Sequence, residues 1–307
     1  IAFMKKYPAI DGNLKRVIAR LSGLENSKEI ISHSNSRSLI CRGLGRSYGD
    51  AAQLNNAKAI QLKELNYIKL DAKNAVLTAG GGASLDLILK EIVPEGFFLP
   101  VTPGTRNVTI GGAIAADVHG KNHHREGSLG NHLSRILLVN GEGVLKELTP
   151  QGEDSPQFWA TIGGMGLTGV IVEASFSLIP IKTSLVSVDT TRYTDIDSLM
   201  AAMTEADEKY RYSVAWVDSL NKKGRGVLTC GDHASKDQVQ SKASLKDPLF
   251  YDPKSLASAP SFLPSGLLNK VSVRLFNEAW YRKYPVSQKN ELQAISPYFH
   301  PLDGIQD

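Results

Sequence analysis

Short apolar runs separated by polar turns dominate the first part of the chain, and amphipathic segments interrupt them. Runs rich in branched apolar residues, typical of β-strands, occur at residues 38–41, 59–62, 68–70, 75–78 and 170–180. Apolar positions recur with helical spacing over 11–22 and 85–92, and Ser84 is placed to cap the second of these helices. A shorter helix is expected over 155–160. The pattern predicts a domain that mixes helices with strands.

A hairpin and a second unit follow from the same kind of pattern. Asn140-Gly141 suits a tight turn between strands at 136–139 and 144–148. The pattern of apolar and polar residues changes near residue 184. From there it predicts strands at 184–189 and 211–217 that flank a helix over 196–209. We therefore expect an α+β fold with two domains, residues 1–183 and 184–307, of which the second contains an antiparallel sheet.

A proline-rich stretch in the second domain carries several large apolar residues. Residues 252–269 contain Pro253, Pro260 and Pro264 together with Phe262 and the apolar run around it. Because proline interrupts regular structure, we expect a loop here. Two interpretations stay open: the apolar side chains tuck under the domain, or they form a mobile cover or a contact for a lipid tail.

Composition and charge are ordinary for a globular enzyme. The chain has 307 residues, 42% of them hydrophobic and 21% charged, and a net charge of +4 implies no nucleic-acid partner. Its apolar stretches are too short to span a bilayer, and its start lacks the apolar stretch of a signal peptide. Cys41 and Cys230 cannot build a disulfide framework. We expect a cytoplasmic protein, with peripheral contact at the inner membrane face as the alternative.

Runs of glycine and small residues carry the chemistry. Residues 42–50 read RGLGRSYGD after an apolar strand, and their glycines let successive backbone N–H groups point at one anion. Later runs at 102–105 (TPGT) and 111–115 (GGAIA) leave room for a flat ring system against the backbone. The spacing of Gly43, Gly45 and Gly49 matches neither the Rossmann fingerprint nor a Walker loop. Together the runs predict a dinucleotide held with its diphosphate at the first loop.

These motifs resemble those of the flavoproteins of the vanillyl-alcohol-oxidase and p-cresol-methylhydroxylase type. The resemblance rests on residues 42–50, on 103–106 (PGTR), on 111–124 (GGAIAADVHGKNHH), on 212–218 (YSVAWVD) and on 300–303 (HPLD). It covers most of the chain and implies an FAD-binding domain followed by a substrate domain. Relatives continue well beyond the HPLD motif and supply a lysine and a tyrosine near the flavin there. We therefore expect this chain to be a fragment with an incomplete substrate domain.

The resemblance assigns the contacts with FAD to the small-residue runs. The residues that it implies for FAD are Arg42, Gly43, Leu44, Gly45, Arg46, Ser47, Tyr48, Pro103, Gly104, Thr105, Thr109, Gly111, Gly112, Ala113, Ala116, Val118, His119, Gly120, Gly169 and Ile171. Many relatives attach the flavin covalently through a histidine after the second glycine of the first loop. Arg46 occupies that position here, and arginine cannot form the link. We therefore expect non-covalent FAD.

Three residues are implied in catalysis. His119 follows a small-residue segment that we expect to be a strand, and the resemblance places it against the flavin; the alternative is a histidine satisfied by backbone bonds. Lys121 would meet a substrate phosphate or the reduced flavin, and Tyr48 would hydrogen-bond the substrate. The substrate pocket is implied to contain Lys121, Trp216, Phe299 and Leu302, with Phe299 where the nearest relatives have a tyrosine.

Three further histidines raise the question of a metal. His123, His124 and His132 match no zinc spacing and have no cysteine or paired carboxylate beside them. We expect no metal site, and expect His123 and His124 to stiffen their loop by hydrogen bonds.

The implied reaction is the oxidation of a secondary alcohol on a sugar. Within the family the resemblance points to oxidation of a polyprenyl-phosphoryl ribose at its 2′-hydroxyl, the first half of an epimerisation that supplies arabinose for cell-wall arabinan. It implies a short-chain reductase partner for the keto sugar and a quinone or oxygen as electron acceptor. Two alternatives stay open: an aldonolactone or alditol oxidase that uses oxygen, and an inactive flavin-binding fragment.

Overall fold

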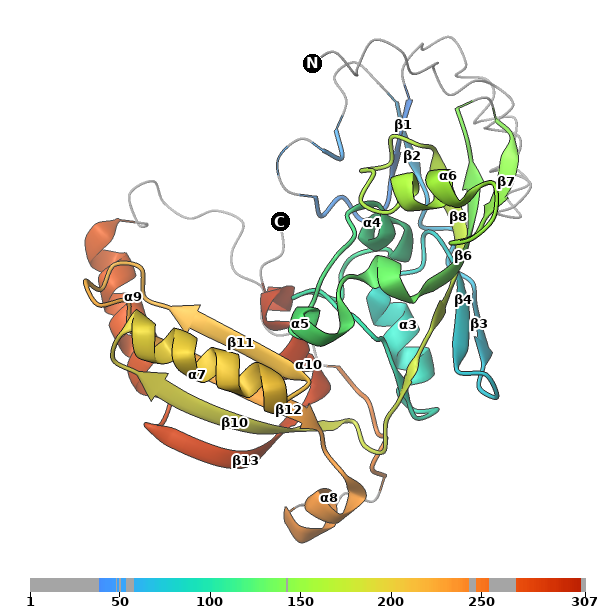
Figure 1. The fold of residues 1–307 in the computed structure, drawn as a ribbon. Helices are drawn as coiled ribbons and strands as arrows, with labels where there is room; N and C mark the ends of the chain where they lie inside the picture. The colour runs from blue at the N-terminus through green and yellow to red at the C-terminus, as the bar shows by residue number, and fades with distance from the viewer. Residues whose placement is uncertain are drawn as a thin grey trace. The chain divides into compact units, whose positions relative to one another are not determined.

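The computed structural model describes residues 39–47, 49, 51–53, 58–141, 143–242, 247–253 and 269–304. The expected helix over 11–22, Tyr48 and most of the proline-rich stretch 252–269 lie outside these residues. The chain divides into two compact units (Figure 1). Of the described residues, those within 39–100, 106–118 and 128–180 form the first unit, and those within 101–105, 119–127 and 181–304 form the second. The expected domain division after residue 183 stays a prediction.

A five-stranded antiparallel sheet forms the centre of the first unit. Its strands, in spatial order, are β3 (Ile68–Asp71), β4 (Val76–Gly80), β8 (Val170–Ser177), β6 (Leu133–Val139) and β7 (Leu145–Leu148). The first unit also contains two separate two-stranded sheets. One is the parallel pair β1 (Leu39–Arg42) and β2 (Lys58–Gln61), and the other is the antiparallel pair β5 (Phe97–Phe98) and β9 (Ile179–Pro180). Its helical segments are α3 (Leu85–Ile92), α4 (Ile110–Ala115), η2 (Leu129–His132) and α6 (Ser155–Thr161).

Most of the predicted elements of this unit are confirmed. Helix α3 has the predicted bounds, and the Ser84 side chain caps it by accepting the N–H of Leu87 at 3.1 Å. The predicted hairpin is β6–β7, with Asn140 at its turn. The apolar run 170–180 is two strands rather than one, because β8 pairs with β4 and β6 whereas β9 pairs with β5.

One prediction in this unit is wrong. The small-residue segment before His119 is the helix α4, not a strand. Thr109 caps this helix by accepting the N–H of Gly112 at 3.2 Å. The small residues allow close packing: a Cβ on Gly111 would lie 2.7 Å from the carbonyl oxygen of Gly81. A run of glycine and alanine therefore marks a close approach here rather than an extended strand.

The second unit is built on a four-stranded antiparallel sheet. Its spatial order is β11 (Tyr212–Val217), β12 (Gly226–His233), β10 (Leu185–Tyr193) and β13 (Ser287–Ala294). Its helical segments are α5 (His123–Glu126), α7 (Ile196–Lys209), α8 (Lys236–Lys242), α9 (Lys270–Lys283), α10 (Ile295–Phe299) and η3 (Pro301–Gly304). Helix α7 has the predicted bounds, and its Leu199 and Ala206 pack on Leu228 and Cys230 of the sheet. The expected antiparallel sheet is present, and the α+β class is confirmed.

Among the described residues, the helices are too short or too polar to cross a bilayer.

Candidate functional site

The loop after β1 lies in the first unit and has no room for side chains at Gly43 and Gly45. A Cβ on Gly43 would lie 2.3 Å from Thr109 Oγ1, and Gly45 adopts a φ of +68° that favours glycine. The guanidinium of Arg42 lies directly against Gly45, because a Cβ there would be 2.3 Å from its Nη2. This loop therefore meets the residue that caps α4, so two of the predicted small-residue runs come together.

Arg46 differs from its neighbours in this loop. Its Nε atom is buried and has no hydrogen-bond partner among the described residues, whereas Leu44 and Ser47 are exposed. A buried guanidinium donor without a partner is costly and favours an acceptor that arrives with a ligand. The diphosphate of a dinucleotide supplies such an acceptor. The loop therefore fits FAD on an observation of its own.

The remaining predicted flavin contacts of the first unit lie along α4 and β8. Ala113 is buried in α4, and Ala116 and Val118 follow it, with the Val118 carbonyl accepting the N–H of Leu129 at 2.9 Å. Gly169 adopts a φ of +147°, and a Cβ there would lie 2.3 Å from the carbonyl oxygen of Val139. Ile171 is buried in β8. These positions are governed by close backbone approach.

The predicted residues 103–105 belong to the second unit, where the segment 300–303 holds them. Thr105 donates its hydroxyl hydrogen bond to Asp303 at 2.8 Å, and the Leu302 N–H donates to the Gly104 carbonyl at 3.0 Å. The neighbouring Thr102 hydroxyl lies 3.0 Å from His300 Nε2. The Leu302 side chain also packs on Gly104, where a Cβ would lie 3.0 Å from it. Residues 102–105 and 300–303, which are far apart in sequence, therefore pack together, and we call this pair of segments the ledge.

Lys121 occupies an unusual environment in the second unit. Its ammonium donates a hydrogen bond of 2.5 Å to the Tyr298 carbonyl and lies 4.3 Å from the centroid of the Tyr298 ring. Its own carbonyl accepts the N–H of Ser213 at 2.9 Å, which fixes the backbone against β11. Burial away from water lowers the pKa of Lys121 to about 8. Lys121 can therefore exchange a proton near neutral pH.

The histidines around Lys121 do not form a metal centre in the described part of the chain. The rings of His119 and His123 lie 5.3 Å apart, and His124 Nε2 lies 3.2 Å from the Tyr210 carbonyl. The hydrogen bond expected at His124 is thus present, while His132 belongs to η2 of the first unit. Gly120 contacts the ledge, since a Cβ there would lie 2.7 Å from the Thr102 carbonyl oxygen.

Phe299 lies in a buried aromatic cluster behind Lys121. Its ring centroid is 4.7 Å from Tyr212, 4.9 Å from Tyr298 and 5.9 Å from His233. Burial lowers the pKa of His233 to about 3, so this histidine is neutral at physiological pH. Trp216 is half-buried on β11, and Leu302 is 40% exposed in η3. Phe299 therefore packs between rings, and Leu302 is the accessible member of the predicted substrate pocket.

Sequence reasoning missed the partners that position these residues. It assigned no role to Thr102, Tyr298 or Asp303, although each bonds to a predicted residue or its neighbour. The HPLD motif at residues 300–303 could have pointed to the role of Asp303. Tyr298 contributes to Lys121 through its backbone carbonyl, which no residue pattern reveals.

Comparisons with known proteins agree with this chemistry. A protein family described as FAD binding domain matches residues 25–149. The chain is 41% identical over 277 residues to decaprenylphosphoryl-beta-D-ribose oxidase of Mycolicibacterium smegmatis, which covers 89% of this chain and 60% of that protein. It is 35% identical over 233 residues to an uncharacterized protein in the mprA 5′ region of Streptomyces coelicolor, covering 72% and 62%.

A more distant relative is an oxidase of a sugar lactone. The chain is 24% identical over 220 residues to L-gulonolactone oxidase 3 of Arabidopsis thaliana, covering 69% of this chain and 36% of that protein. The chain spans about three fifths of the length of the two more similar relatives.

The burial of Lys121 predicts a pH dependence of stability. Its pKa is about 8 in the folded chain against 10.5 for an ordinary lysine, so between these values only the unfolded chain holds the proton. The contribution of Lys121 to the free energy of unfolding should therefore rise with pH across this window, by at most about 3 to 4 kcal/mol. The thiols of Cys41 and Cys230, whose pKa values burial raises to about 12, contribute in the opposite direction above pH 9. Lys121→Met lacks the lysine contribution, so the difference in free energy of unfolding between wild type and Lys121→Met should rise from pH 7 to 10.5, as measured by urea unfolding.

The exposed Lys182 offers a matched substitution in the same unit. Lys182→Met should keep the wild-type pH dependence. Parallel curves for wild type and Lys121→Met would show that Lys121 is solvated in the folded chain.

Proposed function

We propose, from the premise that the chain carries the FAD-binding domain of the FAD-linked oxidoreductases, that its protein oxidises a secondary alcohol of a sugar. The substrate in this proposal is a polyprenyl-phosphoryl-β-D-ribose, whose 2′-hydroxyl becomes a ketone. The observation that carries the proposal is the 41% identity to decaprenylphosphoryl-beta-D-ribose oxidase, which extends over 89% of the chain and so includes residues of both units.

The residues of the first loop fit a non-covalent FAD. Gly43 and Gly45 let the loop pack directly against Thr109 and the Arg42 guanidinium, and the unpartnered Nε of Arg46 would donate to a diphosphate oxygen. Arg46 also occupies the position of the linking histidine of covalent relatives. When bound, FAD supplies the acceptor for the hydride that leaves the alcohol carbon. The proposal includes the two-part organisation of the p-cresol-methylhydroxylase type, with a substrate domain that this chain contains in part.

Lys121 and His119 are the proposed proton-handling residues. A lysine with a pKa of about 8 can take the proton of a hydroxyl near neutral pH, and in its charged form it can bind a phosphate oxygen. The Tyr298 carbonyl holds its ammonium in one place, which favours either role. His119 lies against His123 and would orient the substrate or share the proton. Tyr48 is retained in the proposal as a substrate hydrogen-bond donor.

The substrate pocket in this proposal combines Lys121 with Trp216, Phe299 and Leu302. Leu302 is exposed on η3, and Thr105 and Asp303 fix the ledge that carries it. Because Phe299 is buried among rings, its contribution is to shape the pocket floor.

The product of such a reaction requires further partners. A keto sugar must be reduced to yield the epimeric arabinose, so we propose a short-chain reductase as the second enzyme, and cell-wall arabinan synthesis as the setting. Electrons must leave the reduced flavin for a quinone or oxygen.

An aldonolactone or alditol oxidase is the second candidate. The similarity to L-gulonolactone oxidase 3 over 69% of the chain favours it, at a lower identity of 24%. The two candidates differ in the substrate that should reduce the flavin.

Because Gly45 has a left-handed backbone conformation, we expect a substitution at this position to weaken FAD binding. Gly45→Ala strains a φ of +68° and pushes the Arg42 guanidinium aside, so the Kd for FAD should rise at least about tenfold. Gly152→Ala is the matched control, because its φ of +89° is equally unfavourable and its Cβ would meet nothing within 4 Å. Fluorescence titration of the apoprotein with FAD measures both. Equal affinities of the two variants would contradict the assignment of this loop.

The reaction is tested by anaerobic absorption spectroscopy of the purified protein. Polyprenyl-phosphoryl ribose should bleach the flavin band, and acid precipitation should leave all the FAD in the supernatant. In Lys121→Met the bleaching rate should fall by about 100-fold, because a positioned proton acceptor contributes on that order. Bleaching by free alditols or lactones alone, with rapid peroxide release, would favour the second candidate.

A further inference from the structure

Helix α9 presents apolar side chains to solvent on its outer side. Val271 is 67% exposed, Leu275 68% and Phe276 57%, and we call these three residues the α9 face. The opposite side of the helix packs against the rest of the second unit. There the buried side chain of Asn277 donates a hydrogen bond of 2.7 Å to Asp218 Oδ1. Clustered large apolar side chains in water are unfavourable and mark a surface that meets a partner.

Basic residues border the α9 face. Arg274 lies one helical turn from Val271, and Lys283 extends over the Trp280 ring at 4.8 Å from its centroid. Among the described residues Lys270 and Arg274 form no ion pair, so their charges are available. A helix that pairs apolar side chains with arginine and lysine is typical of binding in the plane of a membrane surface.

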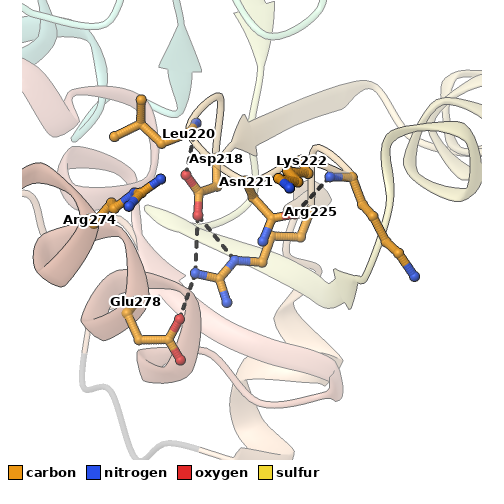
Figure 2. Close-up of a pocket in the computed structure, with 8 residues that line it drawn as sticks. Asp218, Leu220, Asn221, Lys222, Arg225, Arg274 and Glu278 are labelled. Carbon is orange, nitrogen blue, oxygen red and sulfur yellow. Dashed lines mark hydrogen bonds and ion pairs between the residues drawn. The ribbon is translucent and has the colours of Figure 1, made fainter. Parts of the chain in front are cut away.

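A pocket of about 490 Å³ adjoins this helix. It is lined by two residues of α9 and six residues of the turn between β11 and β12 (Figure 2), namely Arg274, Glu278, Asp218, Leu220, Asn221, Lys222, Lys223 and Arg225. Figure 2 shows the Arg225 guanidinium between two carboxylates, and it lies 3.0 Å from Asp218 Oδ2 and 2.6 Å from Glu278 Oε2. One positive and two negative groups leave a single net negative charge here. The remaining charges of the pocket are the cations Lys222, Lys223 and Arg274, so the pocket favours an anion.

We propose that the α9 face and this pocket dock the protein onto the surface of an anionic lipid bilayer. The three apolar side chains would enter the interface, while Arg274 and Lys222 would meet headgroup phosphates. The charge of the border selects this occupant, because an apolar protein partner would not require unpaired cations on the rim. The fourteen residues of α9 extend for about 21 Å, enough for several headgroups. None of the proposed flavin or substrate residues takes part.

Vesicle sedimentation of the FAD-loaded protein tests this surface. The protein should sediment with vesicles of phosphatidylcholine mixed with phosphatidylglycerol, and remain in solution with phosphatidylcholine alone. Leu275→Glu and Arg274→Glu should each weaken binding at least about fivefold, the change that roughly 1 kcal/mol corresponds to. Added salt should weaken binding of the wild type as well.

Met200→Glu is the matched control, since Met200 is 61% exposed on α7 of the same unit. It should bind vesicles like the wild type, and the flavin absorbance of every variant reports that the protein is folded. No sedimentation with the anionic vesicles, or an equal loss in Met200→Glu, would overturn the proposal. Self-association in the absence of vesicles that Leu275→Glu abolishes would overturn it in favour of an interface between two copies. Flavin content is measured separately, so failure of the proposed oxidation would be distinguishable.

Discussion

Direct contact between backbones is the constraint on which the first unit depends. A Cβ on Gly82 would lie 1.7 Å from the Leu62 carbonyl oxygen, and a Cβ on Gly81 would lie 2.0 Å from that of Ile171. Real side chains cannot occupy such positions, so only glycine lets β4 continue into this junction. The N–H of Gly111 donates to the Gly81 carbonyl at 2.9 Å, which ties α4 to the same point. The junction therefore fixes the start of α4, where Thr109 meets Gly43 of the loop after β1.

The second unit uses side chains for the same purpose. Thr102, Thr105 and Lys121 come from short segments that are distant in sequence from the sheet, and each is bound by a residue between Tyr298 and Asp303. Behind them the rings of Tyr212 and Phe299 exclude water. The same exclusion lowers the pKa of Lys121, so the packing that positions this lysine also gives it its proposed chemistry.

Sequence patterns predicted elements well where periodicity was strong. The bounds of helices α3 and α7 were predicted, and for α3 the capping residue Ser84 was predicted as well. Strand β13 escaped prediction, since SQKNELQA has few apolar residues and reads as a polar segment. The helix α4 was misread as a strand because glycines and alanines carry no period, and only the packing against Gly81 reveals their purpose.

The chemistry of the site was predictable only in part. The loop after β1 was predicted from its glycines and from resemblance. In contrast, a carbonyl 177 residues away in the chain holds the Lys121 ammonium, and burial in the folded chain lowers its pKa. No local pattern specifies such a partner, because burial and long-range contact arise only in the folded protein. The structure thus adds the contacts and the burial of the residues that the resemblance implied, and the role of each residue stays a proposal.

The proposed oxidation at the 2′-carbon is tested most sharply by the deuterium isotope effect on flavin reduction. Polyprenyl-phosphoryl ribose deuterated at the 2′-carbon would be mixed anaerobically with the FAD-loaded protein in a stopped-flow spectrophotometer. Bleaching of the flavin should be severalfold slower with the deuterated substrate, because in the proposed reaction the hydride leaves that carbon. Bleaching at equal rates with both substrates, or no bleaching at all, would contradict hydride removal from the 2′-position.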